Sequence, residues 1–98
     1  MVRVQYQSAA RADLIEIWLQ IADDSIERAD DYIVKLQEIC ELISDQPEMG
    51  VERPEIADGV RSFPVDHYVI YYEQREPPLL VLRVWHAARD PLSLSTNT

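Results

Sequence analysis

The chain has 98 residues, of which 47% are hydrophobic and 28% are charged, and its formal net charge is -9. This length suits one domain that folds without disulfides or metals, and an acidic balance excludes tight, nonspecific binding to nucleic acid. Residues 13–58 hold fourteen acidic and three basic side chains, whereas residues 59–98 hold four of each. The second, neutral half is therefore the part suited to meet an anionic partner.

The longest aliphatic run, Leu79 to Leu82, is too short to cross a bilayer, and the N-terminus lacks a signal-peptide pattern. We therefore expect a cytoplasmic protein without a membrane contact. The one cysteine, Cys40, lies on a predicted apolar helix stripe, so it is expected to be a buried, reduced thiol.

The first segments predict a short strand and then a helix. Residues 2–6 alternate valine and tyrosine with polar residues, as a strand does. Ser8 is a candidate N-cap for a first helix that ends near Ala22. One face of this helix is apolar and the other is polar. The apolar positions are Ala10, Leu14, Ile17, Trp18 and Ile21, and the polar positions are Arg11, Asp13, Glu16 and Gln20.

A second helix is predicted to begin at Asp24, which has Glu27 three residues later in the capping-box arrangement. Its apolar residues recur at intervals of three and four, which is typical of a helix seam, so we expect an antiparallel helical hairpin. These residues are Ile26, Ala29, Ile33, Leu36, Cys40 and Ile43. Pro47 ends the helix, and residues 47–59 are expected to form a long loop.

Three strands are predicted next, at residues 60–65, 67–73 and 79–86, with a REPP turn between the last two. Short connections predict an antiparallel meander, and residues 67–73, apolar on both faces, suit the middle of the sheet. The fold class is therefore α+β, with an N-terminal strand and an antiparallel helical hairpin packed on a small antiparallel β-sheet. Residues 1–98 are expected to form a single domain, with 92–98 as a flexible tail.

The stretch RVWHAARDP, at residues 83–91, gathers side chains suited to phosphodiester chemistry. RNA cleavage through the neighbouring 2′-hydroxyl needs a base, an acid and cations that stabilise the phosphate charge. Glu55 is a candidate base and His86 a candidate acid. The candidate cations are Arg61, Arg83 and Arg89.

The same residues also have structural interpretations. Arg83 alternates with Val81 and Trp85, so its stem is suited to lie along apolar surface with its head group in water. Arg89 followed by Asp90 is a frequent turn arrangement just past a strand end.

Arg61 and His86 have structural interpretations of their own. Arg61 is suited to a local brace with Glu55, Asp58 or Asp90. His86, next to a tryptophan, is consistent with a packed ring that has one nitrogen bonded to backbone.

The sequence indicates no cofactor and no metal site. Two histidines, His67 and His86, with the distant Cys40 have no metal-ligand spacing. With only Gly50 and Gly59, the chain has no glycine-rich phosphate loop.

The order of several motifs resembles the ParE branch of the RelE/ParE toxin superfamily. These motifs are ARADLIEIW, PEMG followed by RPEI, GVRSFPV, YVIYY and RVWHAARDP. The resemblance runs to about Leu92, and it rests on the joint order, since no single motif is specific.

The resemblance implies a toxin of a type II toxin-antitoxin system. Its antitoxin would be ParD-like, with a ribbon-helix-helix part that binds operator DNA and a flexible segment that folds onto the toxin. Contact with operator DNA would then be indirect. The ParE branch is associated with poisoning of DNA gyrase, and the RelE branch with cutting of messenger RNA on the ribosome.

The residues favour the gyrase branch. The RNA-cutting branch commonly has an arginine just after the aromatic residue that begins the central strand, and here Val69 follows Tyr68. We therefore expect a binding protein without catalytic residues, and a ribosome-dependent endoribonuclease using Glu55, Arg61, His86 and Arg89 is the alternative. The residues expected to bind partners are Arg61, Arg83, Trp85, His86 and Arg89.

Overall fold

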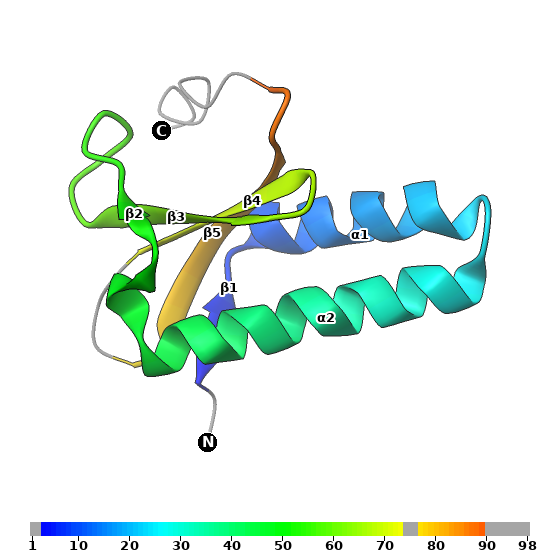
Figure 1. Ribbon diagram of the computed structural model, residues 1–98, viewed down its shortest axis with the longest axis horizontal. Helices are drawn as coiled ribbons and strands as arrows, with labels where there is room; N and C mark the ends of the chain where they lie inside the picture. Colours follow the sequence, from blue (N-terminus) through cyan, green and yellow to red (C-terminus); the bar gives the residue numbers. More distant parts are fainter. Residues whose placement is uncertain (1–2, 74–76, 90–98) are drawn as a thin grey trace.

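A computed structural model describes residues 3–73 and 77–89, in which two helices lie on one face of a five-stranded sheet (Figure 1). The helices are α1 (Ser8–Ala22), α2 (Ile26–Asp45) and a short 3-10 helix, η1 (Pro47–Met49). The strands are β1 (Val4–Tyr6), β2 (Val51–Glu52), β3 (Val60–Val65), β4 (Tyr68–Glu73) and β5 (Leu79–His86). None of these helices is long and apolar enough to span a membrane.

The strand order is β1-β5-β4-β3-β2, so β4 is central and the predicted meander of β3, β4 and β5 is confirmed. The α+β class and the antiparallel hairpin of α1 and α2 are also confirmed (Figure 1). One detail differs, because β1 runs parallel to β5 and the sheet is therefore mixed. The chain returns to β5 only after both helices and the strands β2, β3 and β4, a long connection that permits parallel pairing.

Both predicted helix caps were wrong by one residue. Gln7 holds the N-cap position of α1 without a side-chain bond, and Ser8 is already helical. Ser25, in place of Asp24, caps α2, and its hydroxyl accepts a hydrogen bond from the backbone N–H of Arg28 at 3.2 Å. The extended backbone at Ser25 (φ -159°) aims the hydroxyl at the free amides of the first turn.

The predicted seam of α2 is buried at Ala29, Leu36, Cys40 and Ile43, but not at Ile26, which is 60% exposed. Ile26 stands in the first turn of α2, beside the connection between the two helices, so it lies outside the core. The predicted REPP turn lies partly outside the described residues, and the predicted tail at 92–98 lies wholly outside them.

The expected loop at 47–59 contains η1 and the edge strand β2, and Tyr72 of the central strand anchors it. The Tyr72 hydroxyl donates to the Pro47 carbonyl at 2.6 Å and accepts from the Gly50 N–H at 3.0 Å. A Cβ at Gly50 would lie 2.4 Å from that hydroxyl, so glycine is required by this close approach. The loop is therefore fixed to the sheet.

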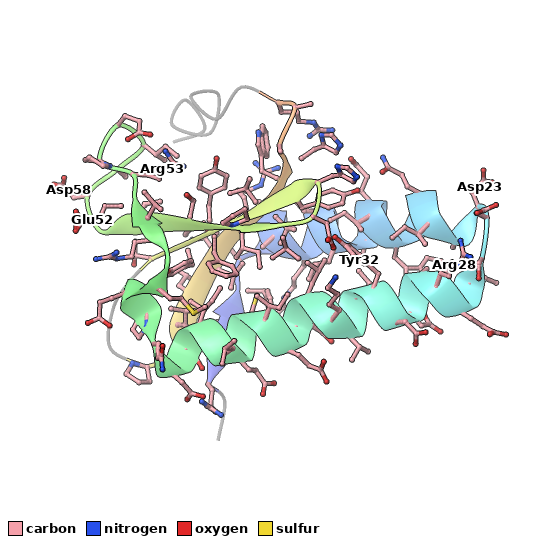
Figure 2. All side chains as sticks on the ribbon, viewed as in Figure 1. Asp23, Arg28, Tyr32, Glu52, Arg53 and Asp58 are labelled. Carbon is pink, nitrogen blue, oxygen red and sulfur yellow. The ribbon has the colours of Figure 1, made fainter. Side chains whose placement is uncertain are left out.

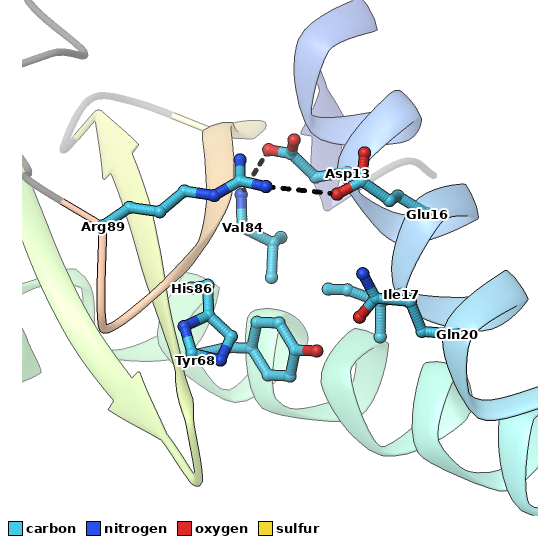
Figure 3. A pocket seen from close by; sticks show the side chains of 8 residues that line it. All are labelled: Asp13, Glu16, Ile17, Gln20, Tyr68, Val84, His86 and Arg89. Carbon is cyan, nitrogen blue, oxygen red and sulfur yellow. Dashed lines mark hydrogen bonds and ion pairs between the residues drawn. The ribbon is translucent and has the colours of Figure 1, made fainter.

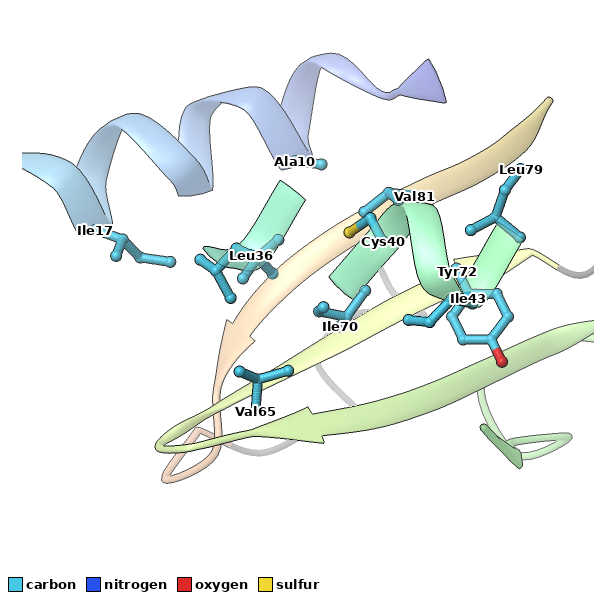
Figure 4. Close-up of a cluster of buried hydrophobic side chains, with 11 residues drawn as sticks. Ala10, Ile17, Leu36, Cys40, Ile43, Val65, Ile70, Tyr72, Leu79 and Val81 are labelled. Carbon is cyan, nitrogen blue, oxygen red and sulfur yellow. The ribbon is translucent and has the colours of Figure 1, made fainter. Parts of the chain in front are cut away.

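The main core lies between the helices and the sheet, where side chains of α1, α2 and the strands meet (Figure 4). Its buried members are Ala10, Ile17, Leu36, Cys40, Ile43, Val65, Ile70, Tyr72, Leu79, Val81 and Val84. A smaller cluster of Val60, Tyr71 and Trp85 lies on the opposite face of the sheet. Both faces of β4 are therefore packed, as its sequence predicted.

The turn between β3 and β4 is tied to α2 by Asp66, which has a left-handed backbone (φ 54°). Its carboxylate accepts from Lys35 Nζ at 2.9 Å and from the Tyr32 hydroxyl at 3.1 Å. These hydrogen bonds lower the pKa of Asp66 below its usual value. The turn is therefore fixed over the middle of α2, which Figure 2 shows with Tyr32 pointing toward the sheet.

Cys40 is buried as predicted, with 1% exposure, and burial raises its pKa to about 11. An unfolded thiol ionises near pH 8.5, so above that pH the unfolded chain loses a proton that the folded chain keeps. The free energy of unfolding should therefore fall by about 1–2 kcal/mol between pH 8 and pH 10.

Urea denaturation of wild type and of Cys40→Ala at both pH values measures this loss. The alanine variant, although less stable, should show a flatter dependence on pH, and an equally steep dependence would contradict the assignment to Cys40.

Candidate functional site

Most of the predicted site residues lie at the end of β5, and a β-bulge in this strand determines which face of the sheet each one occupies. Tyr72 pairs with Val81 but Tyr71 pairs with Arg83, so Leu82 is an extra residue in β5. The bulge shifts the alternation, which leaves Val81 in the main core while Arg83 and Trp85 lie on the opposite face. The expectation that Arg83 shares a face with Val81 was therefore wrong, although it does share one with Trp85.

Arg83 forms a bidentate ion pair with Asp13 of α1. Nε lies 2.7 Å from Oδ2 and Nη2 lies 2.9 Å from Oδ1, and Oδ2 also accepts the backbone N–H of Val84 at 3.0 Å. Both side chains are largely buried, at 21% and 14% exposure, and the hydrogen bonds that Arg83 donates to Asp13 raise the pKa of Arg83 above its usual value. Asp13 was predicted on the polar face of its helix, and its carboxylate is instead largely buried as a partner of β5.

Two guanidinium groups lie near the ring of Trp85. The Arg83 carbon Cζ is 4.5 Å from the centroid of its ring and the Arg89 carbon is 5.2 Å away, both within the range of cation-π attraction. The side chain is 8% exposed, and its buried Nε1 has no hydrogen-bond partner within the described parts of the chain. The ring therefore supports the arginines more than it presents a free surface.

His86 is exposed, and its Nδ1 accepts a hydrogen bond from the backbone N–H of Ala88 at 3.1 Å. The expected bond between a ring nitrogen and backbone is thus confirmed, but the ring packs edge-on against Tyr68, at 5.3 Å and 82°, on the face opposite to Trp85. With Nδ1 as acceptor, a neutral ring carries its proton on Nε2.

Arg89 reaches Glu16 of α1 at 3.4 Å, and both side chains remain more than half exposed. Beneath this pair is a hollow of about 70 Å³ between α1 and the ends of β4 and β5 (Figure 3). Its lining residues are Asp13, Glu16, Ile17, Gln20, Tyr68, Val84, His86 and Arg89.

Arg61 lies on the helix-covered face toward the other end of the sheet and braces the anchored loop. Its Nη1 donates to the carbonyls of Gly50 at 2.7 Å and Glu48 at 3.3 Å, and its Nη2 lies 3.3 Å from a carboxylate oxygen of Glu52. The pairing of β2 with β3 sets Glu52 directly opposite Arg61, which explains why this carboxylate forms the brace.

The expected brace named other carboxylates. Glu55 forms an ion pair with Arg53 at 3.8 Å, and Asp90 is outside the described residues. Figure 2 shows Glu52, Arg53 and Asp58 gathered at the loop end of the sheet, far from the tip of the hairpin marked by Asp23.

The candidate acid and Arg61 do not meet. Arg61 pairs across the strands with Tyr72 and His86 pairs with Tyr68, so the two are four positions apart along β4. Four residues of strand span about 13 Å, whereas groups that act on one phosphate must each lie within hydrogen-bond reach of it. The loop that carries Glu55 packs its Ile56 on the opposite face, against the cluster of Trp85.

Sequence reasoning did not identify the structural roles of Asp13 and Tyr72. An aspartate beside the apolar stripe of a helix ordinarily faces water, and the partner of Asp13, Arg83, is seventy residues away in the chain.

Within residues 3–73 and 77–89, no group of three or more His, Cys, Asp or Glu side chains is arranged to hold a metal ion.

Comparison with known proteins agrees with this fold. The family model for the ParE toxin of the type II toxin-antitoxin system parDE matches residues 4–91. Among solved structures, a chain of the chromosomal ParDE TA system from P. aeruginosa superposes with a TM-score of 0.71 at 19% identity, covering 88% of this chain and 96% of that chain. No curated protein sequence matches.

The fold and the family match together define a toxin of a type II toxin-antitoxin system. The chain belongs to the ParE toxin family.

The substitution Asp13→Asn tests the contact between α1 and β5. It keeps the shape of the side chain but leaves the largely buried Arg83 without its charge partner, so the free energy of unfolding should fall by about 2–4 kcal/mol. Glu16→Gln, one turn along the same helix, removes an exposed pair and should cost less than about 1 kcal/mol. Urea denaturation of both variants provides the measurement, and equal losses would refute the special place given to Asp13.

Proposed function

We propose that this ParE-family toxin acts by binding a protein target, with DNA gyrase as that target, and does not break covalent bonds itself. We further propose that a ParD-like ribbon-helix-helix antitoxin neutralises it in the cytoplasm and links it to operator DNA. Residues 1–98 act as a single domain in this proposal.

The observation that carries the proposal is the lack of convergence among the candidate catalytic groups. Arg61 and His86 lie about 13 Å apart along β4, and the guanidinium groups of Arg61 and Arg83 are already engaged by carbonyl or carboxylate oxygens. A charge-stabilising arginine has to be aimed at the reacting phosphate. Groups engaged in this way instead support a rigid surface.

Val69 supports the same proposal. It lies on the central strand at the position where RNA-cutting relatives commonly carry arginine, and it packs with the cluster of Trp85 and Tyr71. An apolar side chain at this place supplies no phosphate contact.

Five residues were expected to bind partners, and they fall into two groups. His86 and Arg89 are exposed, so we propose that they touch the partner directly. Arg61, Arg83 and Trp85 are mostly covered, and we propose that they hold the surface in shape. For the antitoxin, the short edge strand β2 offers unpaired backbone groups to which an extended segment can add.

Induction of the toxin without its antitoxin tests the proposal when DNA breakage, plasmid supercoiling and transcript integrity are followed separately. We expect DNA damage and loss of negative supercoiling while transcripts remain intact at early times. Rapid transcript cutting with intact DNA would contradict the proposal and favour the RelE-like endoribonuclease.

His86→Ala separates the two activities further. If His86 were the general acid, its loss should lower the rate of RNA cleavage by a factor of about 10² or more. We expect toxicity and the inhibition of purified gyrase to change less than about tenfold, and wild-type thermal stability serves as the control. Transcript cutting by the wild type that disappears in a stable His86→Ala variant, while antitoxin binding stays intact, would refute the non-catalytic assignment.

A further inference from the structure

The hollow between α1, the start of β4 and the end of β5 is lined by several polar side chains, and we name it the Glu16 pocket (Figure 3). Glu16 stands at its rim, Ile17 and Val84 form its apolar wall, and Tyr68 and His86 close the side toward the sheet. The pocket therefore lies between one helix and two paired strands.

The volume of the pocket limits its ligand to a side-chain head group. Pockets for drug-sized molecules or cofactors measure roughly 300–1,000 Å³, whereas this one measures about 70 Å³. A nucleotide does not fit in such a space. A planar guanidinium or a compact ion does.

The chain itself places a guanidinium at this rim. Arg89 lies over the Trp85 ring and extends to Glu16, where its Nη2 is 3.4 Å from Oε1. The pair is long and both partners are more than half exposed, so it is readily exchanged. Arg89 thus shows that a guanidinium fits beside Glu16, and it holds that position only weakly.

Two further acceptors in the pocket have no partner of their own. The side chains of Gln20 and Tyr68 make no hydrogen bond with any residue in the described ranges, 3–73 and 77–89, and the Tyr68 hydroxyl points across the hollow toward α1 (Figure 3). Asp13, in contrast, has both oxygens occupied by Arg83 and Val84. Glu16, Gln20 and Tyr68 together offer oxygens from several directions, as the five N–H groups of an arginine require.

The charge of the surroundings favours a cation over an anion. The segment that contains α1 and α2 carries a large excess of carboxylates, which attracts cationic groups from solution.

We propose that the Glu16 pocket receives an arginine side chain from a protein partner of the toxin, which displaces Arg89 from Glu16. The displaced Arg89 stays on the Trp85 ring and becomes available to a carboxylate of the same partner. The inference rests on the proposed function in one respect, namely that the toxin acts through protein contacts.

The test is an NMR titration of the 15N-labelled toxin with N-acetyl-arginine methylamide. We expect saturable shifts of the Val84 and His86 amide signals. N-acetyl-citrulline methylamide, which has the same shape without the charge, should give none, and the lysine analogue should bind at least threefold more weakly. Equal responses to the arginine and citrulline probes, or to the arginine and lysine probes, would overturn the proposal.

Variants locate the binding. Glu16→Gln should weaken binding of the arginine probe at least tenfold, whereas Arg89→Ala, which removes the competing guanidinium, should strengthen it at least threefold. Glu38→Gln removes an exposed carboxylate of α2 and should leave binding unchanged. Unaltered binding in Glu16→Gln, weaker binding in Arg89→Ala, or saturable shifts of the same signals with inorganic phosphate in place of the arginine probe would each contradict the pocket assignment.

This titration measures binding alone, so it is independent of what the toxin inhibits. A toxin that cut RNA would fail the induction experiment and could still bind the arginine probe. A toxin without an arginine pocket could still inhibit gyrase.

Discussion

The carboxylate of Asp13 forms a hydrogen bond with the outer edge of β5, just beyond the point where the pairing of β5 with β1 ends. β1 pairs with β5 only as far as Val81, and within residues 3–73 and 77–89 no strand lies beside the outer edge of β5 beyond that point. An unpaired backbone N–H in a partly buried place costs free energy, and Oδ2 of Asp13 satisfies that of Val84. The Asp13 side chain thus accepts a hydrogen bond that the backbone of a neighbouring strand would otherwise accept.

The same carboxylate determines what the end of β5 can present. By holding Arg83 in a bidentate pair it keeps that guanidinium over the Trp85 ring, and Arg89 lies near the same ring. The bulge at Leu82 is what brings Arg83 and Trp85 to the face opposite the main core. The sequence of residues 83–89 suggests a catalytic acid with several cations, but most of these side chains form structural contacts. His86 and Arg89 are the ones that remain exposed. This arrangement supports recognition of a partner more than attack on a phosphate.

Much of the fold could be predicted because it follows from periodic patterns. Residues close together in the chain predict the apolar stripes of both helices, the end of α2 before Pro47 and the central place of β4. The helix caps were missed by one residue, since Asp24 and Ser25 are both good caps and backbone conformation decides between them. The parallel pairing of β1 was missed because it joins segments far apart in the chain.

The site was harder to predict for a related reason. Strict alternation assigned Arg83 to the face of Val81, and only the register with β4 reveals the extra residue at Leu82. Asp13 has no local signal, because its role depends on a strand seventy residues later. Arg61 was expected to form a brace, and it does, but the pairing of β2 with β3 selected Glu52. Local patterns therefore predict the elements, and contacts between distant elements decide the chemistry of the side chains.

Amide hydrogen exchange at Val84 measures the central contact most directly, because that N–H faces Asp13 and not a neighbouring strand. We predict that it exchanges slowly in the wild-type toxin, comparably to amides within the pairing of β4 and β5, and much faster in Asp13→Ala, which has no side-chain oxygen, while the central amides stay protected. Fast exchange of Val84 in the wild type, at the rate of an unprotected strand edge, would contradict the account.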